Sequence, residues 1–174
     1  FTIQIDGSLL LFMARGAIKV WREGIVKTII EEIPEERESR FNDVIAHPWG
    51  RGFCGTMSSP TKLGSLYRLD TDGHLTRVLE GIRTSNGMGF TPDRRHMYYT
   101  DSRRLEIYLF DYVYHSGALS NLRVFVRTVE CEGVPDGMTV DAEGYVWSAR
   151  WDGGCLVRYS PQGQEVLRIS FPAK

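Results

Sequence analysis

The stretch that decides the fold runs from Pro135 to Tyr159 and reads PDGMTVDAEGYVWSARWDGGCLVRY. Turn-forming residues at 141–144 separate an opening segment from a strand-like segment at 145–150. A third segment, residues 154–159, alternates in side-chain character as a half-buried strand does. Short runs of β-branched and aromatic residues between Gly and Asp turn signals predict antiparallel hairpins.

The same unit recurs along the chain. Taking Gly7, Gly50, Arg94 and Gly144 as one equivalent turn gives steps of 43, 44 and 50 residues, close to the length of one four-stranded propeller blade. Second strands are expected at 52–57 and 96–100, and third strands at 16–21, 64–69 and 105–110. The 174 residues therefore predict an all-β fold, a β-propeller with about four blades in this chain.

Three groups of residues are expected to play no part in chemistry. The segment from Ile29 to Arg40 is the best helical candidate, but it contains Pro34 and five glutamates, and we interpret it as a solvated connection between blades. The histidines are scattered near turns and are expected to be solvated loop residues: His47, His74, His96 and His115. Trp49, Trp147 and Trp151 are expected to fill spaces between blades rather than stack on sugars.

Composition excludes several classes of protein. The chain is 42% apolar and 25% charged with a formal charge of -1, which is typical of a soluble globular protein. No apolar run approaches the roughly 20 residues that span a bilayer, and no basic excess favours nucleic acid. We therefore expect a small neutral or anionic partner, with neither nucleic acid nor a membrane.

The cysteines indicate a reducing compartment. Cys54, Cys131 and Cys155 are odd in number and far apart, and they form no CxxC pair. Neither a disulfide framework nor a thiolate zinc site is predicted. The expected location is the cytoplasm.

Three polar side chains share one phase in the repeat. Asn42, Asn86 and Asp136 each lie six residues before the turn position occupied by Pro48, Pro92 and Ala142. The first strand of each propeller blade lines the central channel, so we expect the three side chains to converge there. Carboxylate and amide oxygens suit Ca²⁺, Mg²⁺ or Mn²⁺ better than a structural zinc. The alternative is that Asn86-Gly87 and Asp136-Gly137 are turn formers only.

An ordered set of motifs carries a family resemblance. The motifs are Arg40-Phe41-Asn42-Asp43, Gly55-Thr56-Met57, Leu66-Tyr67-Arg68-Leu69-Asp70, Ser85-Asn86-Gly87, Met97-Tyr98-Tyr99-Thr100-Asp101-Ser102, Gly117-Ala118-Leu119-Ser120-Asn121, Pro135-Asp136-Gly137 and Ala149-Arg150-Trp151. From about Arg40 to the C-terminus the chain resembles the SMP-30/gluconolactonase/regucalcin family. Before Arg40 only the blade-like periodicity is similar.

The resemblance implies a six-bladed propeller with one divalent cation in its channel. By position, Asn86 and Asp136 match the family's metal ligands, and Arg40 and Asn42 match its substrate-binding pair. A further ligand of the family, a glutamate, would lie upstream of Phe1. Residues 1–174 are then expected to be a single propeller domain that is incomplete at both ends, and an unclosed ring is expected to self-associate through its exposed faces. Val44 replaces the glycine that commonly follows the Asn-Asp pair.

The function that the resemblance implies is a metal-dependent lactonase, a hydrolase of carboxylic esters that opens a sugar lactone to the sugar acid. The expected cofactor is one divalent cation, with Ca²⁺ the first choice and Zn²⁺, Mg²⁺ or Mn²⁺ as alternatives. Asp136 is expected to take a proton from water, Arg40 to hold substrate oxygens and Asn42 to position the substrate. Two alternatives stay open: a non-catalytic metal-binding module, and a hydrolase of phosphotriesters or other activated esters.

Other enzyme classes find little support in the sequence. Residues 50–55 spell GxGxxG, but a strand-like segment and Pro60 follow where a dinucleotide site needs a helix. The chain has no GxSxG, HExxH or Walker motif. A dinucleotide enzyme, a serine esterase, a zinc protease and a P-loop NTPase are therefore not expected.

Overall fold

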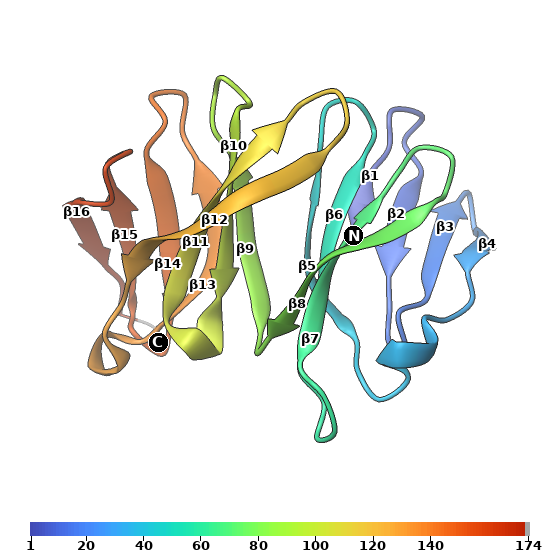
Figure 1. Ribbon diagram of the computed structural model, residues 1–174, viewed down its shortest axis with the longest axis horizontal. Coiled ribbons are helices and arrows are strands. Elements are labelled where there is room, and N and C mark those ends of the chain that lie inside the picture. The colour runs from blue at the N-terminus through green and yellow to red at the C-terminus, as the bar shows by residue number, and fades with distance from the viewer. Residues whose placement is uncertain (173–174) are drawn as a thin grey trace. The chain divides into compact units, whose positions relative to one another are not determined.

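The computed structural model describes residues 1–172, and these form four antiparallel four-stranded sheets (Figure 1). Each sheet consists of four strands that follow one another in the chain and pair in that order. Strand order, period and all-β content match the expectation. The helices among the described residues are 3₁₀ turns of three residues each, and none is long and apolar enough to cross a membrane.

The first compact unit, residues 1–85, holds two of the sheets. One contains β1 (Thr2–Ile3), β2 (Leu9–Phe12), β3 (Ile18–Arg22) and β4 (Ile25–Ile30). The 3₁₀ helix η1 (Pro34–Glu36) leads to the other sheet, β5 (Phe41–Ala46), β6 (Gly52–Thr56), β7 (Gly64–Leu69) and β8 (Leu75–Ile82). Their facing apolar side chains, among them Ile18, Phe41 and Cys54, form one core.

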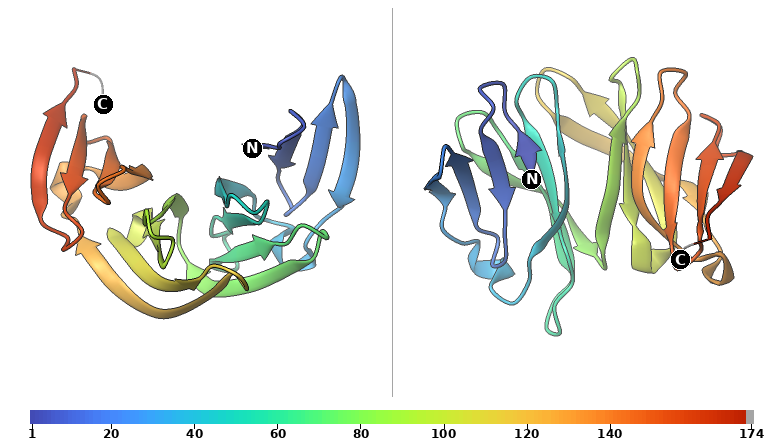
Figure 2. Two further views of the ribbon diagram at one scale, coloured as in Figure 1. Left: turned by 90° about the horizontal axis from the view of Figure 1, so that it is seen from above. Right: turned by 180° about the vertical axis from the view of Figure 1, so that it is seen from behind.

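The second unit, from residue 86 onward, repeats this arrangement. One sheet contains β9 (Ser85–Phe90), β10 (His96–Asp101), β11 (Glu106–Val113) and β12 (Ala118–Arg127), with η2 (Ser102–Arg104) between β10 and β11. After η3 (Glu130–Glu132) come β13 (Val134–Val140), β14 (Val146–Trp151), β15 (Cys155–Tyr159) and β16 (Glu165–Ser170). Tyr98, Ile107, Val146 and Val157 lie in the core between these two sheets, and both units can be followed from two further sides in Figure 2.

The four turns taken as equivalent do share one geometry. In each, the backbone N–H of the fourth residue donates to the first carbonyl: Gly7 to Gln4, Gly50 to His47, Arg94 to Thr91 and Gly144 to Asp141. In each, the fourth residue has a positive φ, between 56° at Arg94 and 86° at Gly144. Aspartates complete several of the turns, because the Oδ1 atoms of Asp6, Asp93 and Asp141 accept the N–H two residues on. Arg94 therefore occupies a position that favours glycine.

This position predicts a measurable difference between two substitutions. Both Arg94→Gly and Arg94→Ala remove the hydrogen bond from Nη1 to the Tyr114 hydroxyl (2.9 Å). Only glycine removes the steric strain of a positive φ at this position. We therefore expect the free energy of unfolding of Arg94→Gly to be about 1 kcal/mol higher than that of Arg94→Ala. Urea denaturation of the two variants measures the difference, and equal stabilities would contradict it.

The acidic connection is not wholly solvated. Residues 29 and 30 belong to β4, no α-helix forms, and Ile33 and Glu36 are buried, Glu36 with 0% exposed. The turn begun by Pro34 directs Glu36 inward, where its Oε1 accepts hydrogen bonds from Lys62 Nζ (2.6 Å) and the Tyr67 hydroxyl (2.8 Å). Burial, and then the bond to Glu36, raise the pKa of Tyr67. The expectation of a surface segment is therefore wrong at Glu36, because the half-buried Lys62 supplies a counter-charge and Tyr67 a hydrogen-bond donor to the buried carboxylate.

Removing the Tyr67 hydroxyl tests this buried contact. We expect Tyr67→Phe to lower the free energy of unfolding by about 2 kcal/mol, because the buried carboxylate loses a donor. Tyr108→Phe is the matched control: its hydroxyl also donates to a glutamate, Glu106 (2.6 Å), but that side chain is 15% exposed and has Arg127 beside it. A loss for Tyr67→Phe no larger than that for the control would contradict the interpretation.

Burial also corrects two further expectations. His47 is buried, with 2% of its surface exposed, although it precedes a turn. Trp49 and Trp151 are exposed at 52% and 68% and so do not fill space within the units.

Apolar side chains are exposed on β4 and β16, among them Ile25 and Ile169. Self-association through such faces stays a prediction.

Candidate functional site

Asn86 and Asp136 meet in the second unit. Asn86 is the second residue of β9, Asp136 is the third of β13, and both are half-buried. The Asn86 side-chain Nδ2 donates a hydrogen bond to Asp136 Oδ1, and the Asn86 Oδ1 accepts the backbone N–H of Gly87 (3.2 Å). The two residues, 50 positions apart in the chain, are therefore brought together as the shared phase predicts.

Close approach of β9 to β13 depends on glycine. A Cβ at Gly87 would lie 2.6 Å from the carbonyl oxygen of Asp136 and 2.6 Å from the backbone nitrogen of Met138. A Cβ at Gly89 would lie 2.6 Å from a methyl group of Val140. Sequence reasoning missed this feature, although two glycines in a strand-like segment are the usual signal of close backbone approach.

A β-bulge positions Asp136. Pro135 pairs with Arg150 and Met138 pairs with Ser148, so Asp136 and Gly137 together oppose a single residue of β14. A bulge of this kind turns a side chain out of the regular alternation of the strand. Asp136 can therefore point toward Asn86 while its neighbours remain paired.

The same irregularity occurs at Asn42 in the first unit. Phe41 pairs with Thr56 and Val44 with Cys54, so Asn42 and Asp43 together oppose one residue of β6. The first strands of two sheets, β5 and β13, thus each present a polar residue at the same point of a similar bulge. The bulge at Asn42 includes Asp43, the residue directly before Val44.

Arg40 and Asn42 form the second pair of predicted residues. Arg40 Nη1 donates to Asn42 Oδ1 (2.9 Å) and to the carbonyl of Phe41 (3.0 Å). Asn42 Nδ2 donates to the carbonyl of Ser85 (2.9 Å). The Asn42 amide is thereby held at both ends, while the exposed Arg40 side chain keeps further N–H groups for a ligand. Asn42 and the pair Asn86–Asp136 belong to different units, so their convergence stays a prediction.

The donors at Asn86 and Asp136 fit a hard divalent cation in kind. A carboxylate and an amide supply oxygen ligands, and a half-turn of the Asn86 amide would exchange Nδ2 for Oδ1 beside Asp136. Within residues 1–172 no cluster of three or more His, Cys, Asp or Glu side chains is placed to hold a metal. The pair therefore offers two protein ligands, and a hard cation would complete its shell with waters or other oxygens.

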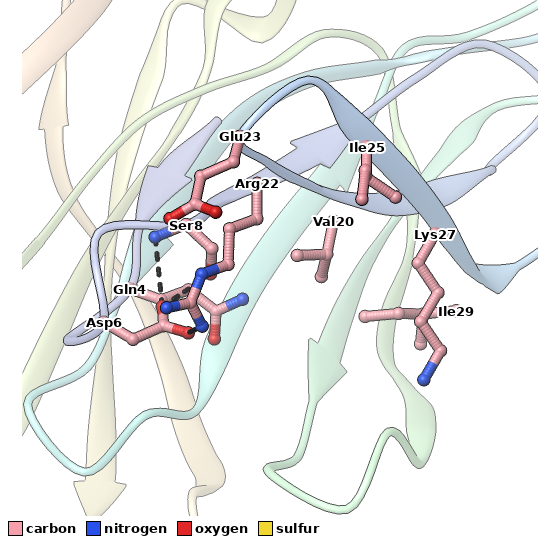
Figure 3. A pocket seen from close by; sticks show the side chains of 9 residues that line it. All are labelled: Gln4, Asp6, Ser8, Val20, Arg22, Glu23, Ile25, Lys27 and Ile29. Atoms are coloured by element: carbon pink, nitrogen blue, oxygen red, sulfur yellow. Dashed lines mark hydrogen bonds and ion pairs between the residues drawn. The ribbon is translucent and has the colours of Figure 1, made fainter.

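A separate groove of about 550 Å³ lies on the first sheet, lined by side chains of β3, β4 and the turn between β1 and β2 (Figure 3). Asp6 and Arg22 face each other in it as an ion pair (2.9 Å), and Ser8 donates to the same aspartate. None of the predicted site residues lines this groove. Three of its polar side chains are already paired, since Arg22 and Ser8 both bind Asp6.

Comparisons with known proteins identify the family of the chain. The model of the SMP-30/gluconolactonase/LRE-like region matches residues 1–174. The chain belongs to this family. It is 47% identical to the pentonolactonase XacC of Haloferax volcanii over 99% of the chain and 59% of that protein, and 38% identical to regucalcin of Danio rerio over 98% and 59%.

The family's solved structures confirm the fold. The crystal structure of a calcium-binding protein, regucalcin, from Agrobacterium tumefaciens matches with a TM-score of 0.88 at 26% identity, over 98% of this chain and 59% of that one. The four sheets are therefore blades of a propeller of this family. The chain spans about three fifths of the length of the relatives it matches.

The glycine at position 87 predicts a site-specific effect. We expect Gly87→Ala to lower the free energy of unfolding by about 1–3 kcal/mol, because the methyl group forces β9 away from β13, and to weaken any cation binding at Asn86 and Asp136. Gly137→Ala is the control, since its Cβ meets nothing within 4 Å. Chemical denaturation and calorimetric Ca²⁺ titration measure both effects, and identical behaviour of the two variants would contradict the close approach.

Proposed function

We propose that the protein is a divalent-metal-dependent lactonase that hydrolyses a sugar lactone to the sugar acid. The observation that carries the proposal is the Asn86–Asp136 pair, an amide and a carboxylate brought together on two inner strands. Its family setting supports the substrate class, because the relative with 47% identity is named a pentonolactonase. The name of the Agrobacterium protein, a calcium-binding regucalcin, supports Ca²⁺ as the cation.

The site residues divide the work of ester hydrolysis. A divalent cation held by Asn86 and Asp136 would supply Lewis-acid polarisation of the lactone carbonyl. Asp136 has a second carboxylate oxygen with which to take a proton from the attacking water. The water oxygen bonds to the carbonyl carbon, the ring C–O bond breaks, and the released ring oxygen receives a proton, which leaves a hydroxy acid.

Arg40 and Asn42 are proposed to bind the substrate. The Arg40 guanidinium can donate to hydroxyl oxygens of the lactone and to the carboxylate of the product. The bond from Asn42 Oδ1 fixes one edge of that guanidinium, so its remaining N–H groups have a defined direction. A sugar lactone, with several hydroxyl groups around one ester, matches this set of donors.

The test is hydrolysis of glucono- and pentonolactones by the complete protein, with and without EDTA and after addition of single cations. We expect EDTA to abolish turnover, and Asp136→Asn to lower kcat by about 10²–10⁴-fold, since it removes the proton acceptor and a charged ligand. Asp72→Asn, which makes the same charge change in an exposed turn, should leave turnover unchanged.

Two outcomes would contradict the proposal. Full activity of Asp136→Asn would remove Asp136 from the chemistry. Calcium binding that depends on Asp136, without hydrolysis of any lactone under any cation, would favour a metal-binding module in place of an enzyme.

A further inference from the structure

The loop between β6 and β7, residues 57–63, lies against the candidate substrate residue Arg40. The backbone N–H of Met57 donates to the Arg40 carbonyl (3.1 Å), and Ser39 Oγ donates to the Met57 carbonyl (2.6 Å). Arg40 is also paired with Ala14 on its other side by an isolated bridge. The backbone of Arg40 is therefore fixed between two segments, and the β6–β7 loop is one of them.

Two side-chain contacts tie the far end of this loop to the acidic connection between β4 and β5. Lys62 Nζ donates to the buried Oε1 of Glu36 (2.6 Å), and Thr61 Oγ1 donates to Glu38 Oε2 (2.6 Å). Within the loop, the N–H of Ser59 donates to the Lys62 carbonyl (2.8 Å) and closes a turn. The loop is therefore held at both ends and internally.

The tether at Lys62 is the stronger of the two. Glu36 is fully buried, its only ion pair among the described residues is with Lys62, and its Oε2 has no hydrogen-bond partner there. A buried carboxylate without a cation is strongly disfavoured. A movement of the loop that withdrew Lys62 would leave the buried Glu36 carboxylate without its counter-charge. The ion pair with Glu36 therefore restrains the position of the loop. The contact of Thr61 with Glu38, both exposed, carries no such penalty.

We propose that Glu36 is a positioning residue for substrate binding: through Lys62 it fixes the β6–β7 loop as a wall beside Arg40, and so determines how tightly the lactone is held. The inference rests on the proposed function. It assigns Glu36 and Lys62 no part in the bond-breaking step, since neither lies in the pair Asn86–Asp136. Their effect should appear in substrate binding and not in turnover.

The test compares variants of the complete protein on a sugar lactone. Lys62→Met releases the loop, and we expect KM to rise about tenfold with kcat within twofold of the unaltered protein. Lys62→Arg keeps the charge and should restore KM. Because Lys62→Met leaves a buried charge and can fail to fold, the double variant Glu36→Gln with Lys62→Met removes both charges, and it should show the same raised KM.

Tyr67→Phe separates positioning from stability. It weakens the same buried cluster but leaves Lys62 bound to Glu36, so it should lower Tm without changing KM. Amide hydrogen exchange supplies a readout that does not depend on activity: exchange in residues 57–63 should accelerate in the double variant and not in Tyr67→Phe.

A wild-type KM and unchanged loop exchange in the double variant would overturn the inference while the lactonase proposal stands. A KM that rises equally in Tyr67→Phe would also overturn it, because loss of stability would then explain the effect. If the unaltered protein hydrolyses no lactone, the proposed function fails first, and the substrate role of Glu36 fails with it.

Discussion

A small antiparallel sheet with two apolar faces is stable only when another sheet covers it, and this constraint organises the whole chain. In each unit the covered faces meet in one core, built in the first unit from residues such as Ile18 and Phe41 and in the second from Tyr98 and Val157. Because the four strands of each sheet pair in chain order, the first strand is an edge in every sheet: β1, β5, β9 and β13. Polar side chains can occupy these edges without disturbing a core.

Three of the predicted residues, Asn42, Asn86 and Asp136, lie on these edge strands, and the local backbone geometry positions their side chains. At Asn42 and Asp136 a bulge interrupts the pairing of the strand with its neighbour, which frees the polar side chain from the regular alternation. At Asn86 the glycines on either side of Met88 let the backbone of β13 come near. Fold and site are therefore coupled. The bulge at Asp136 and the close approach at Gly87 are local departures from regular strand geometry, and together they bring the Asn86 amide and the Asp136 carboxylate within hydrogen-bonding distance.

The buried cluster at Glu36 illustrates a second way in which stability and function are connected. Its carboxylate is accessible to no solvent, and Lys62 and Tyr67 both donate to one oxygen. Such a cluster adds little net stability compared with apolar packing, but it allows few alternative arrangements. The β6–β7 loop carries the counter-charge, Lys62, and this buried contact restrains the loop more firmly than its surface hydrogen bond from Thr61 to Glu38 does.

The sequence by itself determined the all-β class, the period of the blades and the phase of Asn42, Asn86 and Asp136, because turn chemistry and strand alternation are local properties of neighbouring residues. It even placed Arg94 in a turn position held elsewhere by glycine, since the spacing did not depend on the residue type. Only the tertiary structure decided that Glu36 is the buried one of the five glutamates in residues 29–40, and that His47 is buried. It also decided that Asp136 accepts a hydrogen bond from Asn86, where Gly87 allows the two strands to approach. Burial and contact depend on which distant segments pack together, and a charged or polar residue looks the same in the sequence whether water or a buried partner surrounds it.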